Sequence, residues 1–76
     1  MKDLLEYIAK SLVDDPDQVS VKESNGEKAI VLELTVAADD MGKVIGKQGK
    51  IAKSIRTITK AAAAKEGKRV TVEIQK

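Results

Sequence analysis

The stretch GKVIGKQGKI, residues 42–51, decides how this sequence is interpreted. Its glycines and lysines together indicate phosphate binding, because glycine lets the backbone approach a ligand closely and lysine supplies positive charge. A P-loop is excluded, since it needs four residues between its two glycines and only three separate Gly42 from Gly46. A dinucleotide-binding loop needs the spacing G-x-G-x-x-G, and the residues after Gly46 do not supply its middle glycine.

What remains is a G-x-x-G turn, Gly46 to Gly49, between two predicted helices. Without a Cβ, these glycines allow the chain to press against a sugar-phosphate backbone. The start of the second helix carries partial positive charge and is a ready anion site. We expect Lys47 and Gln48, at the tip of the turn, to project toward the same phosphates. The aliphatic pair Val44-Ile45 is expected to form the wall of an adjacent groove.

The second helix is predicted to continue the positive charge away from the turn. Four cations fall within an arc of about 120° at about 100° per residue, opposite an apolar stripe. The cations are Lys50, Lys53, Arg56 and Lys60, and the stripe is Ile51, Ile55, Ile58 and Ala62. A solvated face explains such an arc on any helix whose other side is buried. Its continuity with the turn favours a track for a polyanion.

Hydrophobic periodicity predicts three helices and three strands in the order α-β-β-α-α-β. The elements are a helix that Asp3 caps and Pro16 terminates, a strand around 19–22, a hairpin turn at 24–27 built on Asn25-Gly26, a strand over 30–36, a short helix over 41–45 capped by an Asp, a helix over 50–66 ended by Gly67, and a strand over 69–75. Together they predict one α+β domain over residues 1–76, with three helices on one face of a three-stranded sheet. We expect Leu32, Leu34, Ile55 and Val72 to be buried.

Composition excludes most enzyme classes. The 76 residues include no cysteine and no histidine, so thiolate sites, Ser–His pairs and the usual general base are absent. Asp14, Asp15 and Asp17 lie close together, but the spacing of a calcium loop is not met, so a solvated turn is expected and no metal or cofactor. The chain has no apolar run of membrane-spanning length and no secretory segment, which predicts a cytoplasmic protein without a membrane or small-molecule partner.

The charge is strongly polarised along the chain. Residues 1–40 contain four Lys and ten Asp or Glu, a net charge of −6, whereas residues 41–76 contain ten Lys or Arg and two Glu, a net charge of +8. A basic half of this kind favours a polyanionic partner. The single aromatic residue, Tyr7, cannot provide a surface on which several bases stack.

The segment VIGKQGKI, residues 44–51, resembles the V-I-G-x-x-G-x-x-I signature of the KH domain, an RNA-binding module. The signature places its second Ile where this chain has Ala52, so Ile51 comes one residue early. A helix and a hairpin before the signature, with one helix and one strand after it, resemble the type II KH arrangement, αββααβ. The near-minimal length and residues 39–50 are similar to the small stand-alone bacterial KH proteins of the KhpA (YlqC) family.

This resemblance implies a non-enzymatic RNA-binding protein that clamps about four nucleotides of single-stranded RNA at its GXXG loop. It implies a role as an RNA chaperone or post-transcriptional regulator, a possible homodimer, and a possible heterodimer with a Jag/KhpB-type KH protein. The expected RNA-binding residues are Gly42, Lys43, Val44, Ile45, Gly46, Lys47, Gln48, Gly49, Lys50 and Lys53. The alternative is a protein–protein adaptor, with the alanine run 61–64 as a dimer face. The residues alone do not distinguish RNA from single-stranded DNA.

Overall fold

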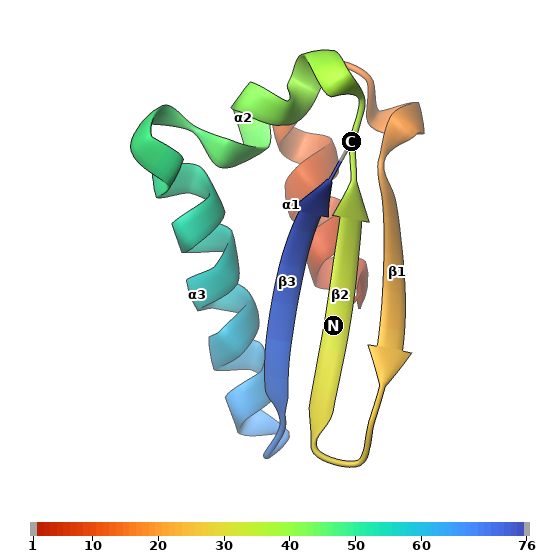
Figure 1. The fold of residues 1–76 in the computed structure, drawn as a ribbon, viewed down its shortest axis with the longest axis vertical. Helices are drawn as coiled ribbons and strands as arrows, with labels where there is room; N and C mark the ends of the chain where they lie inside the picture. Colours follow the sequence, from red (N-terminus) through yellow and green to blue (C-terminus); the bar gives the residue numbers. More distant parts are fainter. Residues whose placement is uncertain (1, 76) are drawn as a thin grey trace.

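A computed structural model describes residues 2–75 and confirms the predicted order of helices and strands (Figure 1). The helices are α1 (Lys2–Leu12), α2 (Met41–Ile45) and α3 (Lys50–Lys65), and the strands are β1 (Ser20–Asn25), β2 (Ala29–Thr35) and β3 (Arg69–Gln75). Short 3₁₀ turns at Pro16–Gln18, Ala38–Asp40 and Lys47–Gly49 connect them. The α+β class and the type II KH order therefore hold.

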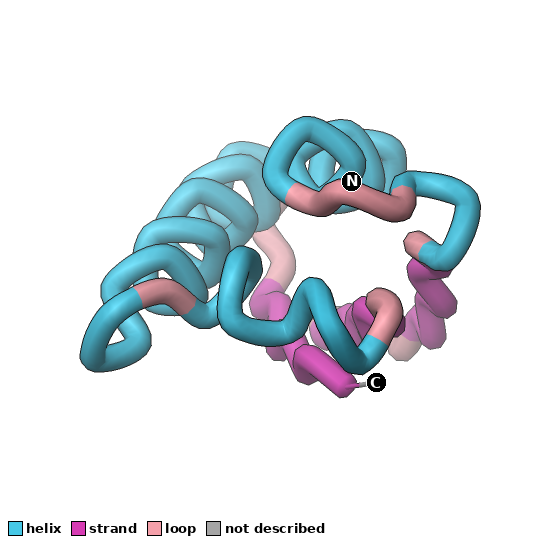
Figure 2. Tube along the Cα trace, turned by 90° about the horizontal axis from the view of Figure 1, so that it is seen from above, coloured by secondary structure: helices cyan, strands magenta, loops and turns pink. Residues whose placement is uncertain are grey.

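The sheet has β2 at its centre, antiparallel to β1 and parallel to β3. Side chains alternate between its faces, so Ile30, Leu32 and Leu34 are buried while their neighbours along β2 are more exposed. Leu32 lies opposite Val72 of β3, and both are buried as predicted. Figure 2 shows all three helices on one side of the strands, so the apolar core lies between these two layers.

The hairpin forms, but its tip differs from the predicted Asn-Gly turn. Asn25 still belongs to β1 and is the register partner of Ile30, so residues 26–29 separate the paired positions. The Gly26 N–H donates to the Ala29 carbonyl at 2.7 Å. A two-residue Asn-Gly turn would pair the residues on either side of it, whereas the longer loop lets Ala29 begin the parallel pairing with Arg69 of β3.

Asp40 holds the loop after α1 and does not cap α2 through its side chain. Asp40 is 3% exposed, and its carboxylate accepts hydrogen bonds from the backbone N–H groups of Asp14 (3.3 Å) and Asp15 (3.1 Å). Burial alone would raise the pKa of Asp40, but these hydrogen bonds and Lys43 lower that pKa below its ordinary value. The contacts join the end of α1 to the start of α2. At the other end of α1, Lys2 is already helical, so Asp3 lies inside the first turn and is not the predicted cap.

Helix α3 packs on the sheet with a face slightly rotated from the predicted isoleucine stripe. Its buried residues are Ala52, Ile55, Thr59 and Ala63, while Ile58 remains 48% exposed. The small side chains allow the helix to approach β3, and the Thr59 hydroxyl is satisfied by donating to the Ile55 carbonyl at 2.7 Å. Of the predicted stripe, only Ile55 is fully buried. The remaining stripe residues lie on the flank of α3 that is turned away from the cations.

Candidate nucleic-acid interface

The turn between α2 and α3 depends on left-handed backbone at three of its four residues. The Gly46 N–H ends α2 by donating to the Gly42 carbonyl at 2.9 Å, and Gly46 then adopts φ 75°, ψ 176°. These angles of Gly46 lie in a region that is essentially restricted to glycine. Gln48 (φ 58°, ψ 24°) and Gly49 (φ 74°, ψ 13°) are both left-handed. This sequence of angles reverses the chain and leads directly into the first turn of α3.

Ile51 explains why the first glycine cannot carry a side chain. A Cβ placed on Gly46 would lie 2.5 Å from Ile51 Cγ1 and 2.8 Å from Ile51 Cβ. The same contact accounts for the shifted isoleucine of the signature. Ala52 takes the buried position on α3, at 4% exposure, and Ile51 covers the turn one residue earlier.

The tip of the turn presents Lys47 and Gln48 to solvent, as the sequence predicted, and Lys50 and Lys53 are also exposed. All four lie at or close to the N-terminus of α3, where the helix dipole favours negative ligands. Of the two predicted groove residues, Ile45 is half-buried and reaches the surface. Val44 is completely buried and supports the turn from inside the core, so it is not available to form a groove wall.

Lys43 is the predicted site residue whose charge is already partly neutralised. Its ammonium lies 2.7 Å from an Asp14 carboxylate oxygen and 3.5 Å from Asp40 Oδ1. These carboxylates raise the pKa of Lys43, with the hydrogen bond to Asp14 as the main cause. Lys43 therefore joins α2 to the loop after α1, whereas Lys47 forms no salt bridge within the described residues.

Gly42 is exposed on α2, and nothing in the fold requires a glycine there. A Cβ at this position would meet no atom within 4 Å, and its φ is not positive. A glycine inside a helix costs stability relative to alanine, by roughly 0.5–1 kcal/mol. The fold therefore does not explain the glycine at this position, and the expected role of Gly42 in ligand binding stays a prediction.

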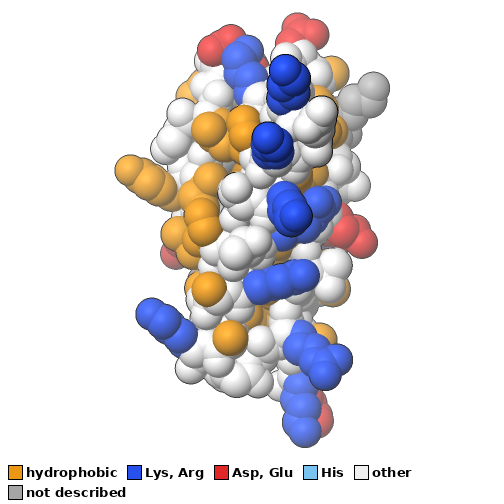
Figure 3. All heavy atoms as spheres, turned by 90° about the vertical axis from the view of Figure 1, so that its left-hand side faces the viewer, with side chains coloured by type: hydrophobic (Ala, Val, Ile, Leu, Met, Phe, Trp, Pro, Cys, Tyr) orange, Lys and Arg blue, Asp and Glu red, His pale blue; other side chains and the backbone are white. Residues whose placement is uncertain are grey.

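A row of cations follows the turn along the outer side of the molecule, and we call it the basic track. Figure 3 shows the row on the face that contains α3, beside a separate area of hydrophobic side chains. The track consists of Lys47, Lys50, Lys53, Arg56 and Lys60, which are all exposed. Within residues 2–75, none of these five cations forms a salt bridge. Arg56 is positioned by donating from Nε to the Val72 carbonyl at 3.4 Å.

Sequence reasoning missed two further cations next to Lys60. Lys68 and Arg69 come from the turn after α3 and the start of β3, and they share a groove with Lys60. The only sequence signal was the basic segment KEGKR at 65–69, whose place beside α3 depends on the parallel pairing of β3.

The described residues contain neither a metal-binding cluster nor a membrane-spanning helix. Across residues 2–75, no three His, Cys, Asp or Glu side chains are grouped in a way that could hold a metal ion. In that same part of the chain, no helix combines the length and the apolar character needed to cross a membrane.

Comparison with known proteins identifies close sequence relatives. A family model described as the KH domain of KhpA/KhpB matches residues 2–74. The protein named RNA-binding protein KhpA from Clostridium acetobutylicum is 72% identical over 74 residues, covering 97% of this chain and 99% of the relative. The proteins of the same name from Aquifex aeolicus and Chlamydia trachomatis are 54% and 47% identical over 74 residues, covering 97% of this chain and 94% and 95% of the relatives.

A solved structure confirms the fold at lower sequence similarity. It is the crystal structure of Era in complex with MgGDPNP and nucleotides 1506–1542 of 16S ribosomal RNA. The TM-score is 0.58 at 21% identity, and the match covers 97% of this chain but only 28% of that chain. This level of identity supports a shared fold for the matched part.

Proposed function

The chain belongs to the KhpA/KhpB KH-domain family, and on that premise we propose that residues 1–76 act as one KH domain that binds short single-stranded RNA. The relatives share the name of an RNA-binding protein, which describes a binding protein and not an enzyme. The proposed clamp is the GXXG turn, with Lys47 and Gln48 at its tip and Lys50 and Lys53 beyond it.

The observation that carries this proposal is that the GXXG turn leads directly into the basic track. A Cβ on Gly49 would point into open space, so its absence leaves room for a phosphate backbone, whereas Gly46 is required by the packing of Ile51. The N-terminus of α3 and the exposed ammonium groups then provide a favourable field over the following turns of the helix. A site without aromatic residues suits a clamp of this type, because the turn holds the sugar-phosphate chain and aliphatic side chains such as Ile45 contact the bases.

We expect wild-type binding of a labelled short RNA to weaken steeply with salt. Three or four neutralised phosphates, at about 0.7 each for a single strand, predict a log–log slope near −2 to −3. Lys53→Ala should reduce affinity modestly and flatten the slope by about 0.7, because it removes one phosphate contact. Fluorescence anisotropy over a series of salt concentrations measures both quantities.

The matched control is Lys22→Ala, which removes an exposed lysine from β1, outside the basic track. This variant should keep the wild-type slope. A slope near zero for the wild type would contradict the proposed RNA clamp, and equal slopes for Lys53→Ala and Lys22→Ala would remove Lys53 from the site.

A clamp that holds single strands opposes base pairing within the bound segment. We therefore propose that the protein acts on RNA structure, as an RNA chaperone or post-transcriptional regulator. The cytoplasmic location expected from the sequence stays a prediction.

Dimerisation is a second candidate function, with a homodimer or a Jag/KhpB-type KH protein as the assembly. It is favoured by two exposed large hydrophobic side chains, Tyr7 on α1 (73% exposed) and Ile58 on α3 (48% exposed). These helices pack side by side on the same face of the sheet (Figures 1 and 2). The alanine run is a weaker candidate face than expected, because Ala63 is buried in the protein's own core.

For the homodimer, sedimentation velocity at tens of micromolar and high salt should show a species larger than the 8.2 kDa monomer. Ile58→Asp should return it to monomer, since a carboxylate in an apolar contact cannot be solvated. Lys60→Asp, also exposed on α3, is the control that changes charge without removing apolar area. A mass of one chain at every wild-type concentration would contradict the homodimer.

A further inference from the structure

A chain of contacts connects the loop after α1 to Lys43, the cation on α2. The nearly buried carboxylate of Asp40 accepts hydrogen bonds from the backbone N–H groups of Asp14 at 3.3 Å and Asp15 at 3.1 Å. These hydrogen bonds fix the backbone of Asp14 beside α2. The Asp14 carboxylate lies 2.7 Å from the Lys43 ammonium, whereas Asp40 Oδ1 lies 3.5 Å from it. The fold therefore supplies Lys43 with an anionic partner from a distant part of the chain.

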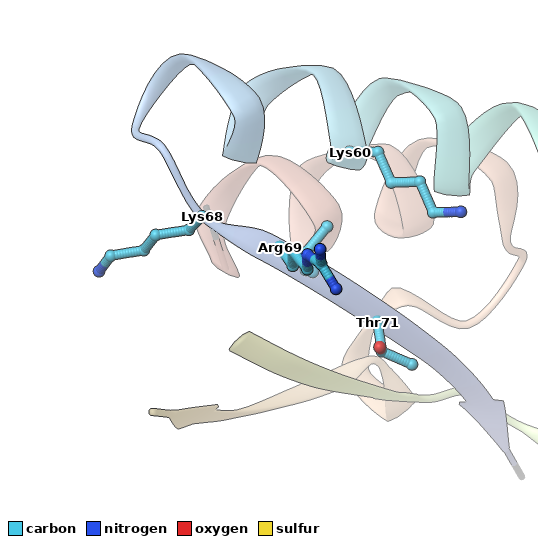
Figure 4. Close-up of a pocket in the computed structure, with 5 residues that line it drawn as sticks. Lys60, Lys68, Arg69 and Thr71 are labelled. Carbon is cyan, nitrogen blue, oxygen red and sulfur yellow. The ribbon is translucent and has the colours of Figure 1, made fainter. Parts of the chain in front are cut away.

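The other cations on this side of the molecule have no such partner. Within residues 2–75, the basic track forms no salt bridge, and neither do Lys68 and Arg69 near its end. Figure 4 shows Lys60 and Arg69 extending from α3 and β3, with Lys68 pointing away from both. Among the predicted site residues in the described part of the chain, Lys43 alone has a carboxylate partner.

The pair between Lys43 and Asp14 lies where a second anion can displace it. The Lys43 side chain is 44% exposed and that of Asp14 is 81% exposed, and exposed ion pairs contribute little stability. The backbone N–H of Asp14 bonds to Asp40 independently of the Asp14 carboxylate, so the loop keeps its place when the pair opens. A phosphate can therefore replace the Asp14 carboxylate at Lys43 without a change of fold.

Lys43 also lies close to the path proposed for RNA. Between Lys43 and Gly46, the helix rises about 4.5 Å at 1.5 Å per residue. At about 3.4 Å per nucleotide, a strand clamped at the turn covers that distance within about two nucleotides. Gly42, next to Lys43, leaves open space, because a Cβ there would meet no atom within 4 Å. Figure 3 shows acidic side chains at the end of the molecule where the row of cations begins.

From this arrangement we infer that Asp14 is a built-in competitor of RNA, which pairs with Lys43 in the free protein and is displaced by a backbone phosphate on binding. The inference rests on the proposed RNA binding and adds a residue that lowers its affinity. In the wild type, Lys43 exchanges one ion pair for another, so this contact releases few ions. A free Lys43 would contribute like the unpaired lysines of the basic track.

The test compares Asp14→Asn with the wild type, using a labelled oligouridylate of eight nucleotides at several salt concentrations. Fluorescence anisotropy should show about threefold tighter binding for Asp14→Asn and a log–log salt slope steeper by about 0.7, from one further phosphate contact. The matched control is Asp17→Asn, which makes the same change at an exposed residue of the same loop that forms no salt bridge within residues 2–75. It should change affinity less than 1.5-fold and keep the wild-type slope, since exposed charges farther away are screened by salt.

A double-mutant cycle with Lys43→Gln assigns the effect to the pair. Lys43→Gln should lower affinity less than about 1.5-fold in the wild type but about threefold in the Asp14→Asn background, because only there is Lys43 free to gain a phosphate. Circular dichroism confirms that each variant is folded.

Three results would overturn the inference. Equal affinity of Asp14→Asn and Asp17→Asn, or an equal loss from Lys43→Gln in both backgrounds, would show that Asp14 does not compete, while RNA binding at the turn still stands. Weaker binding by Asp14→Asn would instead make Asp14 a residue that orients Lys43 toward RNA. If the wild type does not bind the oligouridylate even at low salt, the proposed function and the competition fail together.

Discussion

Affinity for a short single-stranded RNA is expected to fall at least tenfold, about 1.4 kcal/mol, when Lys47 and Gln48 are both replaced by Asp. Both side chains are exposed at the tip of the turn, where the phosphate backbone is proposed to bind. The substitutions remove one positive charge and introduce two negative ones beside the positive end of α3. Fluorescence anisotropy with a labelled oligonucleotide at low salt gives the affinity ratio directly.

This variant should fold normally, which makes the result interpretable. Lys47 has an ordinary φ, and Asp tolerates the left-handed conformation of Gln48 better than most residues do. The variant Gln18→Asp/Lys22→Asp is the matched control, since it makes the same two replacements at exposed positions outside the turn and the basic track. A folded turn variant that binds as tightly as this control would show that the GXXG turn is not the nucleic-acid site.

Among the glycines of this chain, Gly46 is expected to be the one whose replacement by alanine lowers stability most. The new Cβ would lie 2.5 Å from Ile51 Cγ1, and φ 75° with ψ 176° is a region that alanine avoids. Strain and displacement of Ile51 should together cost at least about 2 kcal/mol. For a domain of this size, that cost lowers the midpoint of thermal unfolding by about 8–16 °C, measured by circular dichroism.

Two other glycines of the same segment serve as controls. Gly49→Ala should cost about 1–2 kcal/mol, because its φ of 74° is unfavourable for alanine but no atom lies within 4 Å of the new Cβ. Gly42→Ala should leave stability unchanged or raise it by up to about 1 kcal/mol, since the position is helical and open. Equal midpoints for Gly46→Ala and Gly42→Ala would refute the proposed packing of Ile51 on the turn.

The alternation of apolar residues in the strands and their helical spacing in the helices were sufficient to predict the architecture. Leu32 and Leu34 repeat at period two, and one face of β2 must be buried, so their burial followed from the sequence. The GXXG turn could also be predicted from the local sequence, because a G-x-x-G between two amphipathic segments has few alternatives to a helix–turn–helix connection. The exposed positions of Lys47 and Gln48 follow from that connection.

Side-chain partners far apart in the sequence could not be predicted in this way. Asp40 is suited to cap α2, but its carboxylate instead accepts hydrogen bonds from the backbone N–H groups of Asp14 and Asp15, whose nitrogens lie within 3.3 Å of the carboxylate oxygens. Lys43 carries the same charge as Lys47, yet Asp14, 29 residues away, holds it. Such competition is decided by which groups the fold brings together, and local spacing contains no information about it.

The sequence by itself determined the order of elements, the buried face of each strand, and a basic turn followed by a basic helix face, because these depend on periodicity and backbone preference over a few residues. Tertiary structure decided the rotation of α3 that buries Ala52 and Thr59 and exposes Ile58. It also decided that Arg69 lies beside Lys60, because parallel pairing of β3 with β2 places the start of the strand next to the end of the helix. Both outcomes depend on packing between layers, where shape and distance outweigh the preference of any single segment.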